Sequence, residues 1–228
     1  MERYVIATIK SWNLENCESL IRRYPEHEMI LIKEKEGLTS DWLEKVHPRI
    51  VFFPHWSWII PASIYNKFNC VVFHMTDLPF GRGGSPLQNL LSRGIYETKI
   101  SAIKVEAGVD TGPVYFKEPL DISEGNVDAI LRRASNIIFE KMIPRFFYEE
   151  LIPHEQRGEQ VVFKRRTPEQ SKIPDGLTQR QLYDHIRMLD GEGYPTAYQK
   201  MSTGRIYYRN AHLKGDVVFA DAEFRREQ

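Results

Sequence analysis

The stretch from Cys70 to Leu91 reads CVVFHMTDLPFGRGGSPLQNLL and carries the pattern of a strand, a loop and a helix. Its first four residues form a β-branched and aromatic run, which predicts a buried strand that delivers His74 at its C-terminal end. A loop with three glycines follows, and Ser85 and Pro86 then suit the N-cap and the first position of a helix. Ligands bind at the C-terminal ends of strands in open parallel sheets, so His74 stands where we expect a site.

A second phrase, residues 108–113, reads GVDTGP and follows the alternating apolar run Ile100–Val105. The alternation predicts a strand, and Asp110 then lies in the loop that leaves it. Taken alone, an Asp between two glycines is usually a turn residue that bonds its own backbone, and a single His is more often a hydrogen-bonded core residue. If His74 and Asp110 meet, however, they can hold and move a proton while an amine attacks a carbonyl.

Strand and helix patterns alternate along the first half of the chain. Strands are expected at Tyr4–Ile9, Glu28–Lys33 and Ile50–Phe53, and helices at Leu14–Tyr24, Ser40–Val46 and Ala62–Lys67. This alternation implies parallel pairing with right-handed crossovers. No G-x-G-x-x-G follows the first strand, which disfavours a nicotinamide-binding domain. The predicted fold class is therefore α/β, a Rossmann-like parallel sheet flanked by helices.

The last hundred residues have a different character. A helical stripe of apolar residues predicts a long amphipathic helix across Asn126–Ile143. Beyond it we expect a strand at Gln160–Arg165, a helix at Thr178–Leu189 and short strands at Gly204–Tyr208 and Asp216–Phe219. Pro174-Asp175-Gly176 is a strong turn signal. We therefore predict a main domain over residues 1–175 and a small α+β extension over residues 176–228.

The loop after His74 resembles a run found in folate-dependent formyltransferases, in which His, Leu-Pro, Arg-Gly and Pro recur at the same spacing. Asp110-Thr111-Gly112 falls at that family's usual distance from the His. Phe53–Pro61 is similar to the aromatic loop that borders the family's folate pocket. The segments Lys164–Glu169, His185–Leu189 and Tyr194–Ala197 resemble segments of the nucleotide-sugar and methionyl-tRNA members.

The resemblance implies transfer of a formyl group from 10-formyltetrahydrofolate to a primary amine. His74 would stabilise the tetrahedral oxyanion, and Asp110 would accept the proton of the amine. The implied folate-binding positions are Trp56, Ser57, Trp58, Ile59, Val105 and Asp110, and the implied acceptor-binding positions are Arg82, Gly83, Gly84, Lys164 and Arg166. Without the resemblance, one of the two tryptophans would more simply close on the core, and Lys164-Arg165-Arg166 would be a solvated strand end.

One position departs from the family pattern, because Val72 stands where the family has a catalytic Asn. Loss of one oxyanion donor typically costs about a hundredfold to a thousandfold in rate. Substitute donors include Thr76, Asn89, a backbone N–H of residues 81–84 and an ordered water. Alternatively, a protonated His74 acts alone, or the protein binds ligands without catalysis. We interpret the chain as an active enzyme with Thr76 as the third catalytic residue.

The acceptor is inferred from charge and from the downstream segments. Lys plus Arg and Asp plus Glu both number 31, so no bulk charge attracts nucleic acid. The expected acceptor is therefore a nucleotide-linked amino-sugar, specifically a UDP-4-amino-4,6-dideoxy-N-acetyl-hexosamine of pseudaminic acid synthesis, with no nucleic-acid or membrane partner. A homodimer is compatible with this class. A formyltetrahydrofolate hydrolase and a non-catalytic folate- or nucleotide-binding protein are the alternatives.

The cysteines and apolar segments indicate the compartment. Cys17 and Cys70 lack a metal-ligand spacing and are expected to be free thiols in a reducing compartment, and no metal site is expected. No stretch approaches the roughly twenty apolar residues that span a bilayer. The chain starts directly with a predicted strand rather than a signal peptide. These features predict a cytoplasmic protein.

Overall fold

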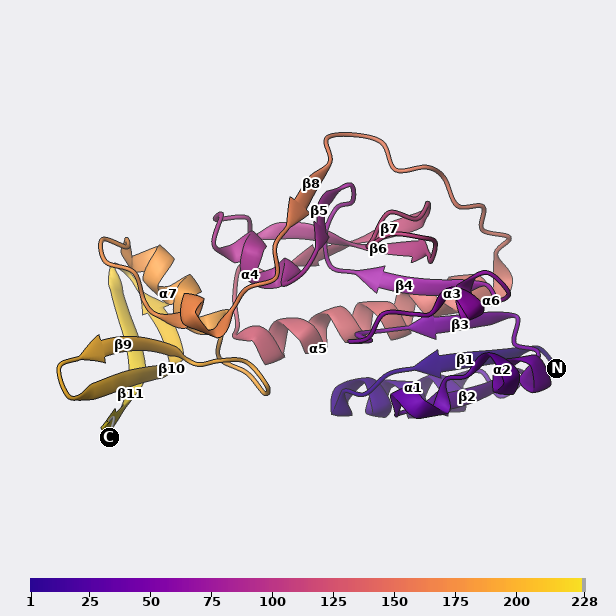
Figure 1. The fold of residues 1–228 in the computed structure, drawn as a ribbon, viewed down its shortest axis with the longest axis horizontal. Coiled ribbons are helices and arrows are strands. Elements are labelled where there is room, and N and C mark those ends of the chain that lie inside the picture. Colours follow the sequence, from indigo (N-terminus) through magenta and orange to yellow (C-terminus); the bar gives the residue numbers. More distant parts are fainter. Residues whose placement is uncertain (227–228) are drawn as a thin grey trace. The chain divides into compact units, whose positions relative to one another are not determined.

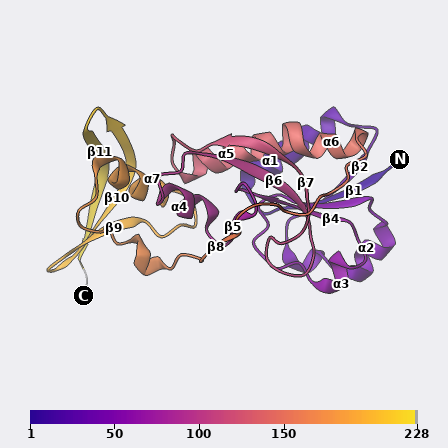
Figure 2. The same ribbon diagram turned by 90° about the horizontal axis from the view of Figure 1, so that it is seen from above.

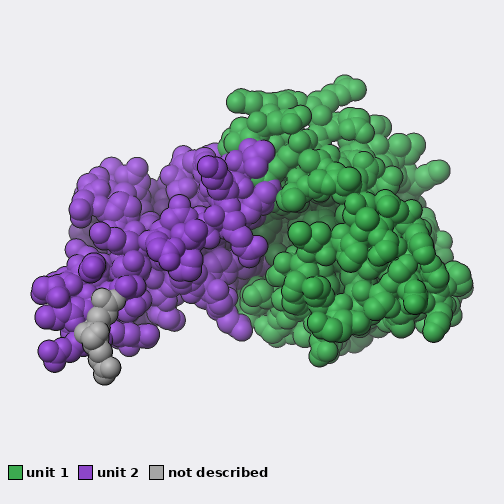
Figure 3. All heavy atoms as spheres, viewed as in Figure 1, with its two compact units in different colours: residues 1–82, 99–120, 132–161 green, residues 83–98, 121–131, 162–228 purple. Residues whose placement is uncertain are grey.

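The computed structural model describes residues 1–226. Backbone contacts divide the chain into two compact units (Figure 3). Unit 1 comprises residues 1–82, 99–120 and 132–161, and unit 2 comprises residues 83–98, residues 121–131 and the chain from residue 162 onward. The predicted domain boundary near residue 175 concerns domains that fold independently, and it stays a prediction.

A six-stranded sheet with the order β2-β1-β3-β4-β6-β7 forms the centre of unit 1 (Figure 1). Its strands are β1 (Arg3–Ala7), β2 (Glu28–Ile32), β3 (Ile50–Phe53), β4 (Cys70–His74), β6 (Glu97–Lys104) and β7 (Val114–Asp121). β1 pairs in parallel with β2 and β3, and β3 pairs in parallel with β4. The α/β class is thus confirmed.

The sheet is mixed rather than wholly parallel, because β4 and β6 are antiparallel. A parallel partner would require a crossover that returns the chain to the end of the sheet where β4 begins. The chain instead starts β6 at the end where β4 finishes. As a result His74 lies opposite Ser101 in the register of this pair.

Helices cover both faces of the sheet, with α1, α5 and α6 on one side and α2 and α3 on the other (Figure 2). Their bounds are α1 (Ser11–Arg23), α2 (Ser40–Val46), α3 (Ala62–Tyr65), α5 (Val127–Ile137) and α6 (Ile143–Tyr148). The predicted helix Asn126–Ile143 is divided in the structure: α5 ends at Ile137, a wide π turn follows at Ile138–Met142, and α6 carries the helical stretch on to Tyr148. Pro144 follows in the first turn of α6, where its missing N–H removes a helical hydrogen bond, and this accounts for the irregular turn.

The core of unit 1 is built on the central strands of the sheet, which are largely buried. All four residues of β3 are buried, as expected for a central strand covered on both faces. Cys17 and Cys70 are free and buried, as predicted. Burial raises the pKa of both thiols to about 12, so neither is a reactive thiolate near neutral pH.

Unit 2 contains a three-stranded antiparallel sheet and short helices. The strands are β9 (Ala197–Met201), β10 (Gly204–Lys214) and β11 (Val217–Arg226), and the helices are α4 (Pro86–Leu91), a single 3-10 turn at Pro168–Ser171, and α7 (Gln179–Arg187). β10 and β11 extend well beyond the two short strands that we predicted. Most residues of β11 are exposed, so little apolar alternation marks this strand in the sequence.

Two further short strands, β5 (Phe80–Gly83) and β8 (Val161–Phe163), form a separate two-stranded sheet. β5 occupies the segment that we expected to be an irregular loop. Its glycines hide the strand from a propensity argument, because glycine is depleted in strands. Within residues 1–226, no helix has the length and apolar character that crossing a membrane requires.

Candidate active site

His74 and Asp110 meet in unit 1, as the two sequence phrases suggested. His74 is the last residue of β4, Asp110 lies in the loop between β6 and β7, and the His74 Nδ1 atom is 3.4 Å from Asp110 Oδ2. The side chains are 8% and 15% exposed, so solvent screens the pair only weakly. The other ring nitrogen, Nε2, lies 2.8 Å from the Gly81 carbonyl oxygen. A carbonyl can only accept, which places a proton on Nε2.

The turn after β4 is held by two hydroxyl groups. Ser101 Oγ donates to the Thr76 carbonyl at 2.7 Å and accepts from the Leu78 N–H at 3.4 Å. Thr76 Oγ1 donates to the Gly81 carbonyl at 3.2 Å, so Gly81 accepts from both His74 and Thr76. Thr76 is completely buried, and its hydroxyl proton is used within the loop.

The Asp110 loop has a tight backbone. Asp110 adopts a φ of 54°, in the left-handed region that Asp tolerates better than most residues. A Cβ atom on Gly112 would lie 1.8 Å from the Lys104 carbonyl oxygen, so this position requires glycine. The Lys104 N–H closes the loop by donating to the Pro113 carbonyl at 3.0 Å. The Asp110 side chain is therefore presented from a constrained turn.

Gln156 links this loop to Arg82 and was not predicted from the sequence. Gln156 Nε2 donates to the carbonyl oxygens of Asp110 and Gly112, both at 2.8 Å. Its Oε1 accepts from Arg82 Nε at 3.0 Å and from Arg82 Nη2 at 2.8 Å. Arg82 Nη1 also donates to Gln160 Oε1 at 3.1 Å. No local motif marks Gln156, because its partners lie more than forty residues earlier in the chain.

The predicted folate-binding positions divide into packed and exposed residues. Trp56 contacts the ring of Phe53 with centroids 5.9 Å apart and that of Trp58 at 4.8 Å, and it packs against the core. Val105 also packs against this core. In contrast, Trp58 is 37% exposed, Ile59 is 87% exposed, and Ser57 is exposed as well. Trp56 is thus the tryptophan that closes on the core.

A buried polar cluster lies beside the aromatic loop. Asn13 Nδ2 donates to Thr8 Oγ1 at 2.7 Å and lies 3.1 Å from His55 Nδ1. His55 Nε2 is buried without a hydrogen-bond partner among residues 1–226. Desolvation, with a smaller contribution from Lys10, lowers the pKa of His55 from 6.5 to about 4. His55 is therefore neutral at pH 7.

The predicted acceptor-binding residues fall in both units. Arg82 belongs to unit 1, and Gly83, Gly84, Lys164 and Arg166 belong to unit 2. In unit 2, the Gly84 N–H donates to the Phe163 carbonyl at 3.1 Å, and a Cβ on Gly84 would lie 2.7 Å from that of Arg165. Glycine at position 84 therefore allows two chain segments to approach closely.

Ser85 and Asn89 have roles that differ from those considered in the sequence. Ser85 does occupy the N-cap position of α4, but its side chain makes no cap hydrogen bond. Its Oγ accepts instead from the Arg166 N–H at 3.1 Å. Asn89 Nδ2 donates to the carbonyls of Gly84, Ser85 and Lys164 within 3.1 Å. The Asn89 amide is thus committed to holding backbone.

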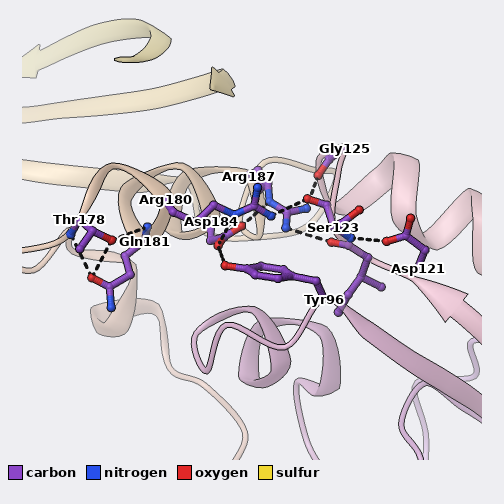
Figure 4. A network of polar contacts seen from close by, with 10 residues as sticks. Tyr96, Asp121, Ser123, Gly125, Thr178, Arg180, Gln181, Asp184 and Arg187 are labelled. Atoms are coloured by element: carbon purple, nitrogen blue, oxygen red, sulfur yellow. Dashed lines mark hydrogen bonds and ion pairs between the residues drawn. The ribbon is translucent and has the colours of Figure 1, made fainter. Parts of the chain in front are cut away.

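Arg187, in the segment His185–Leu189, belongs to a polar network in unit 2 (Figure 4). Arg187 Nε donates to Asp184 Oδ1 at 2.7 Å, and its Nη1 and Nη2 donate to the carbonyls of Gly125 and Ile122, both at 2.9 Å. Asp184 Oδ2 accepts from Tyr96 at 2.7 Å. Arg187 is fully buried, so its guanidinium contributes to folding rather than to an exposed binding surface.

Comparisons with known proteins agree on one enzyme family. A family model described as "Methionyl-tRNA formyltransferase, C-terminal domain" matches residues 168–225. The structure of methionyl-tRNA formyltransferase from Clostridium thermocellum is similar over 100% of both chains, with 47% identity and a TM-score of 0.95. A methionyl-tRNA formyltransferase of Rickettsia felis is 26% identical over 140 residues, covering 59% of this chain and 46% of the relative. This chain spans about half the length of the curated relatives it matches.

These similarities overturn the predicted nucleotide-sugar acceptor, its assignment to pseudaminic acid synthesis and the expected absence of a nucleic-acid partner. A sugar N-formyltransferase from Shewanella shares the fold with a TM-score of 0.71 but is 14% identical, over 92% of this chain and 97% of that one. The charge argument was wrong because net charge is a sum over the whole chain and does not describe a local surface. With full-length similarity at 47% identity, the chain belongs to the folate-dependent formyltransferase family.

Proposed function

We propose that this protein transfers a formyl group from 10-formyltetrahydrofolate to the amine of methionyl-tRNA. The observation that carries the proposal is the His74–Asp110 pair, in a chain that is 47% identical over its whole length to a methionyl-tRNA formyltransferase. The proposed acceptor follows the name of that relative. A cytoplasmic location, predicted from the sequence, is part of the same proposal.

In the proposed reaction the amine nitrogen attacks the formyl carbon of the bound donor and forms a tetrahedral intermediate. The bond from this carbon to the folate nitrogen then breaks, and the formyl group remains on the acceptor. Asp110, directly or through water, takes the proton of the amine and helps to return one to the folate nitrogen. His74 donates a hydrogen bond to the oxyanion. Its Nε2–H now contacts the Gly81 carbonyl, so it has to be shared with the oxyanion or released from this contact.

Val72 cannot serve as a second oxyanion donor, and two of the considered substitutes have other partners. The Thr76 hydroxyl donates to Gly81, and the Asn89 amide donates to three carbonyls. We therefore favour a backbone N–H of residues 81–84 or an ordered water as the second donor. Thr76 retains a proposed role in positioning Gly81, the residue that His74 also contacts.

We assign Gln156 a positioning role in this reaction. Its amide group is the one side-chain type that can donate to two carbonyls while accepting from a guanidinium. Gln156 thereby connects Arg82 with the backbone of Asp110, which faces His74. A displacement of about 1 Å at a reacting group can cost about a hundredfold in rate.

Ligand contacts complete the proposal. The side chains of Trp58 and Ile59 are exposed, and we propose that they offer an apolar surface to the folate ring. Trp56, Ser57, Val105 and Asp110 are the other proposed folate contacts. Arg82, Gly83 and Gly84 are the proposed contacts of the acceptor next to the reacting amine. Lys164 and Arg166 are proposed to contact phosphate groups, a task for which ammonium and guanidinium groups are well suited.

The test is a formyl-transfer assay with purified protein, 10-formyltetrahydrofolate and methionyl-tRNA, in which formyl-methionine is released from the tRNA and quantified. Uncharged tRNA and free methionine are control acceptors, and formate release measures transfer to water. The proposal expects formyl-methionine only with the charged tRNA, and a large loss in His74→Asn. Formate release without any amine product would identify a hydrolase, and donor binding without turnover would identify a binding protein.

A further inference from the structure

Unit 2 contains a cavity, and Arg166, one of the proposed phosphate contacts, lies on its wall. Its volume is about 370 Å³, and it lies between the end of α4, the segment 166–177 and α7. Small-ligand pockets typically measure about 300–1,000 Å³. Residues on its wall include Leu91, Arg166, Lys172, Leu177, His185 and Met188. The cavity thus combines cationic groups with an apolar side.

Among residues 1–226, Arg166 forms no ion pair. Its Nε is buried and has no hydrogen-bond partner in the part of the chain that the structure describes. Its Nη2 donates to the Gln170 carbonyl at 2.5 Å. Desolvation by burial lowers the pKa of Arg166. A desolvated charge without an opposite charge is costly, so the site favours an anion.

Asp184, an acidic residue on the wall, does not supply the negative charge that Arg166 lacks. Arg187 and Arg180 lie 2.7 Å and 3.2 Å from its two carboxylate oxygens, and its side chain is 3% exposed. Two guanidinium groups therefore already compensate its charge. Lys172, an exposed residue on the wall, likewise forms no ion pair among residues 1–226 and adds a second positive charge.

Neutral hydrogen-bonding groups stand beside these cations. His185 Nε2 lies 3.3 Å from the Ser171 carbonyl, and desolvation lowers the pKa of His185, so its ring is neutral at pH 7. The Nδ1 atom is then an acceptor. Ser171 is not itself a wall residue, and its carbonyl orients the His185 ring.

We propose that this cavity binds a phosphate ester, with the phosphate held by Arg166 and Lys172 and the organic part against Leu91, Leu177 and Met188. A phosphate carries up to two negative charges and several acceptor oxygens, which suits one guanidinium and one ammonium group better than a single carboxylate does. For Arg166 this proposal deepens the phosphate contact given under the proposed function. Its test measures binding without the formyl donor, so a failure here is distinguishable from a failure of formyl transfer.

Calorimetric titration of the full chain with phenyl phosphate tests the proposal. Phenyl phosphate presents one phosphate and one apolar ring, and inorganic phosphate serves as the comparison without the ring. We expect saturable binding of phenyl phosphate, at least tenfold weaker in Arg166→Gln and several-fold weaker in Lys172→Gln. The matched control is Arg165→Gln, which removes a neighbouring exposed charge that is not on the wall and should leave binding unchanged.

The outcomes separate the alternatives. No saturable binding, or equal affinity in the wild type and both cavity variants, overturns the proposal; Lys172 is exposed, so its variant is expected to fold. Equal affinity for phenyl phosphate and inorganic phosphate removes the apolar wall from the proposal. Competition with uncharged tRNA identifies the source of the phosphate. If tRNA displaces phenyl phosphate, the cavity is assigned to a nucleic-acid phosphate. If phenyl phosphate stays bound in the presence of tRNA, the cavity is assigned to a small phosphate ester.

Discussion

Two polar clusters with similar residue types, one in each unit, differ in how fully their hydrogen-bonding groups are paired and in how far solvent reaches them. In unit 2, Asp184 and Arg187 are both nearly inaccessible and lie 2.7 Å apart, and Arg187 has backbone carbonyls as further partners. In unit 1, His74 and Asp110 are 3.4 Å apart, and Asp110 remains 15% exposed. A network whose groups are all satisfied stabilises the fold, whereas a looser and accessible pair can bind and move a proton. The comparison separates residues for folding from residues for chemistry.

Removing the unit 1 carboxylate should have the largest effect on activity. Asp110→Asn keeps the shape of the side chain but eliminates the proton acceptor. We expect a loss of about a hundredfold to ten-thousandfold in formyl transfer, typical of a missing general base, with little change in unfolding free energy. Single-turnover kinetics and urea denaturation measure the two quantities. Undiminished transfer would show that Asp110 does not take part in the reaction.

Removing the Arg187 guanidinium of unit 2 should lower stability strongly and the reaction rate little, the opposite of the effect of Asp110→Asn. Arg187→Met leaves Asp184 and two carbonyls with fewer partners in a buried place, and we expect the unfolding free energy to fall by about 3–5 kcal/mol. The rate per folded molecule should change little. The matched control is Arg180→Met, whose 35% exposed side chain also pairs with Asp184 and should contribute about 1 kcal/mol or less. Equal destabilisation by both substitutions would contradict this reasoning.

Gln156 tests whether the unit 1 pair depends on its surroundings. Gln156→Ala removes both donors to the Asp110 loop, and we expect kcat to fall about tenfold to a hundredfold while the donor KM changes little. Gln160→Ala removes only the contact with Arg82 Nη1 and should leave kcat near that of the wild type. If the two variants behave alike, Gln156 has no special role. Gln156→Glu should be worse than Ala, because it places a carboxylate against two carbonyls.

His55 should produce a smaller, pH-dependent effect on stability. Its pKa is lowered to about 4 in the folded protein from 6.5, so the unfolded chain binds a proton first as the pH falls. Above about pH 6.5 the ring is neutral in both states, and His55 does not reduce the free energy of unfolding. As the pH falls from 6.5 toward 4, protonation of the unfolded chain lowers that free energy. We expect a loss on the order of 1–2 kcal/mol between pH 7 and pH 5.

The measurement is urea denaturation of the wild type and His55→Gln across this pH range. The difference in slope between the two proteins isolates His55. His185, whose pKa is also lowered, contributes a slope of the same sign to both. Parallel stability curves would show that folding does not lower the pKa of His55.

The acceptor prediction illustrates the limit of local resemblance. By resemblance the His185–Leu189 segment favours a nucleotide-sugar acceptor, yet Arg187 within it binds Asp184 and two backbone carbonyls. A sequence pattern cannot distinguish an arginine that binds a substrate from one that binds the chain. The difference is burial, which depends on residues some sixty positions away.

The α/β class, the strand that ends at His74 and the resemblance to formyltransferases follow from the amino-acid order, because they depend on hydrophobic periodicity and on short motifs with fixed spacing. The antiparallel pairing of β6, the contacts of Gln156 and the Arg187 network follow from the folded chain instead. Each of these depends on hydrogen bonds between residues far apart in the chain, and such partners leave no local pattern. Burial then decides which charged groups are satisfied and which are available for a ligand.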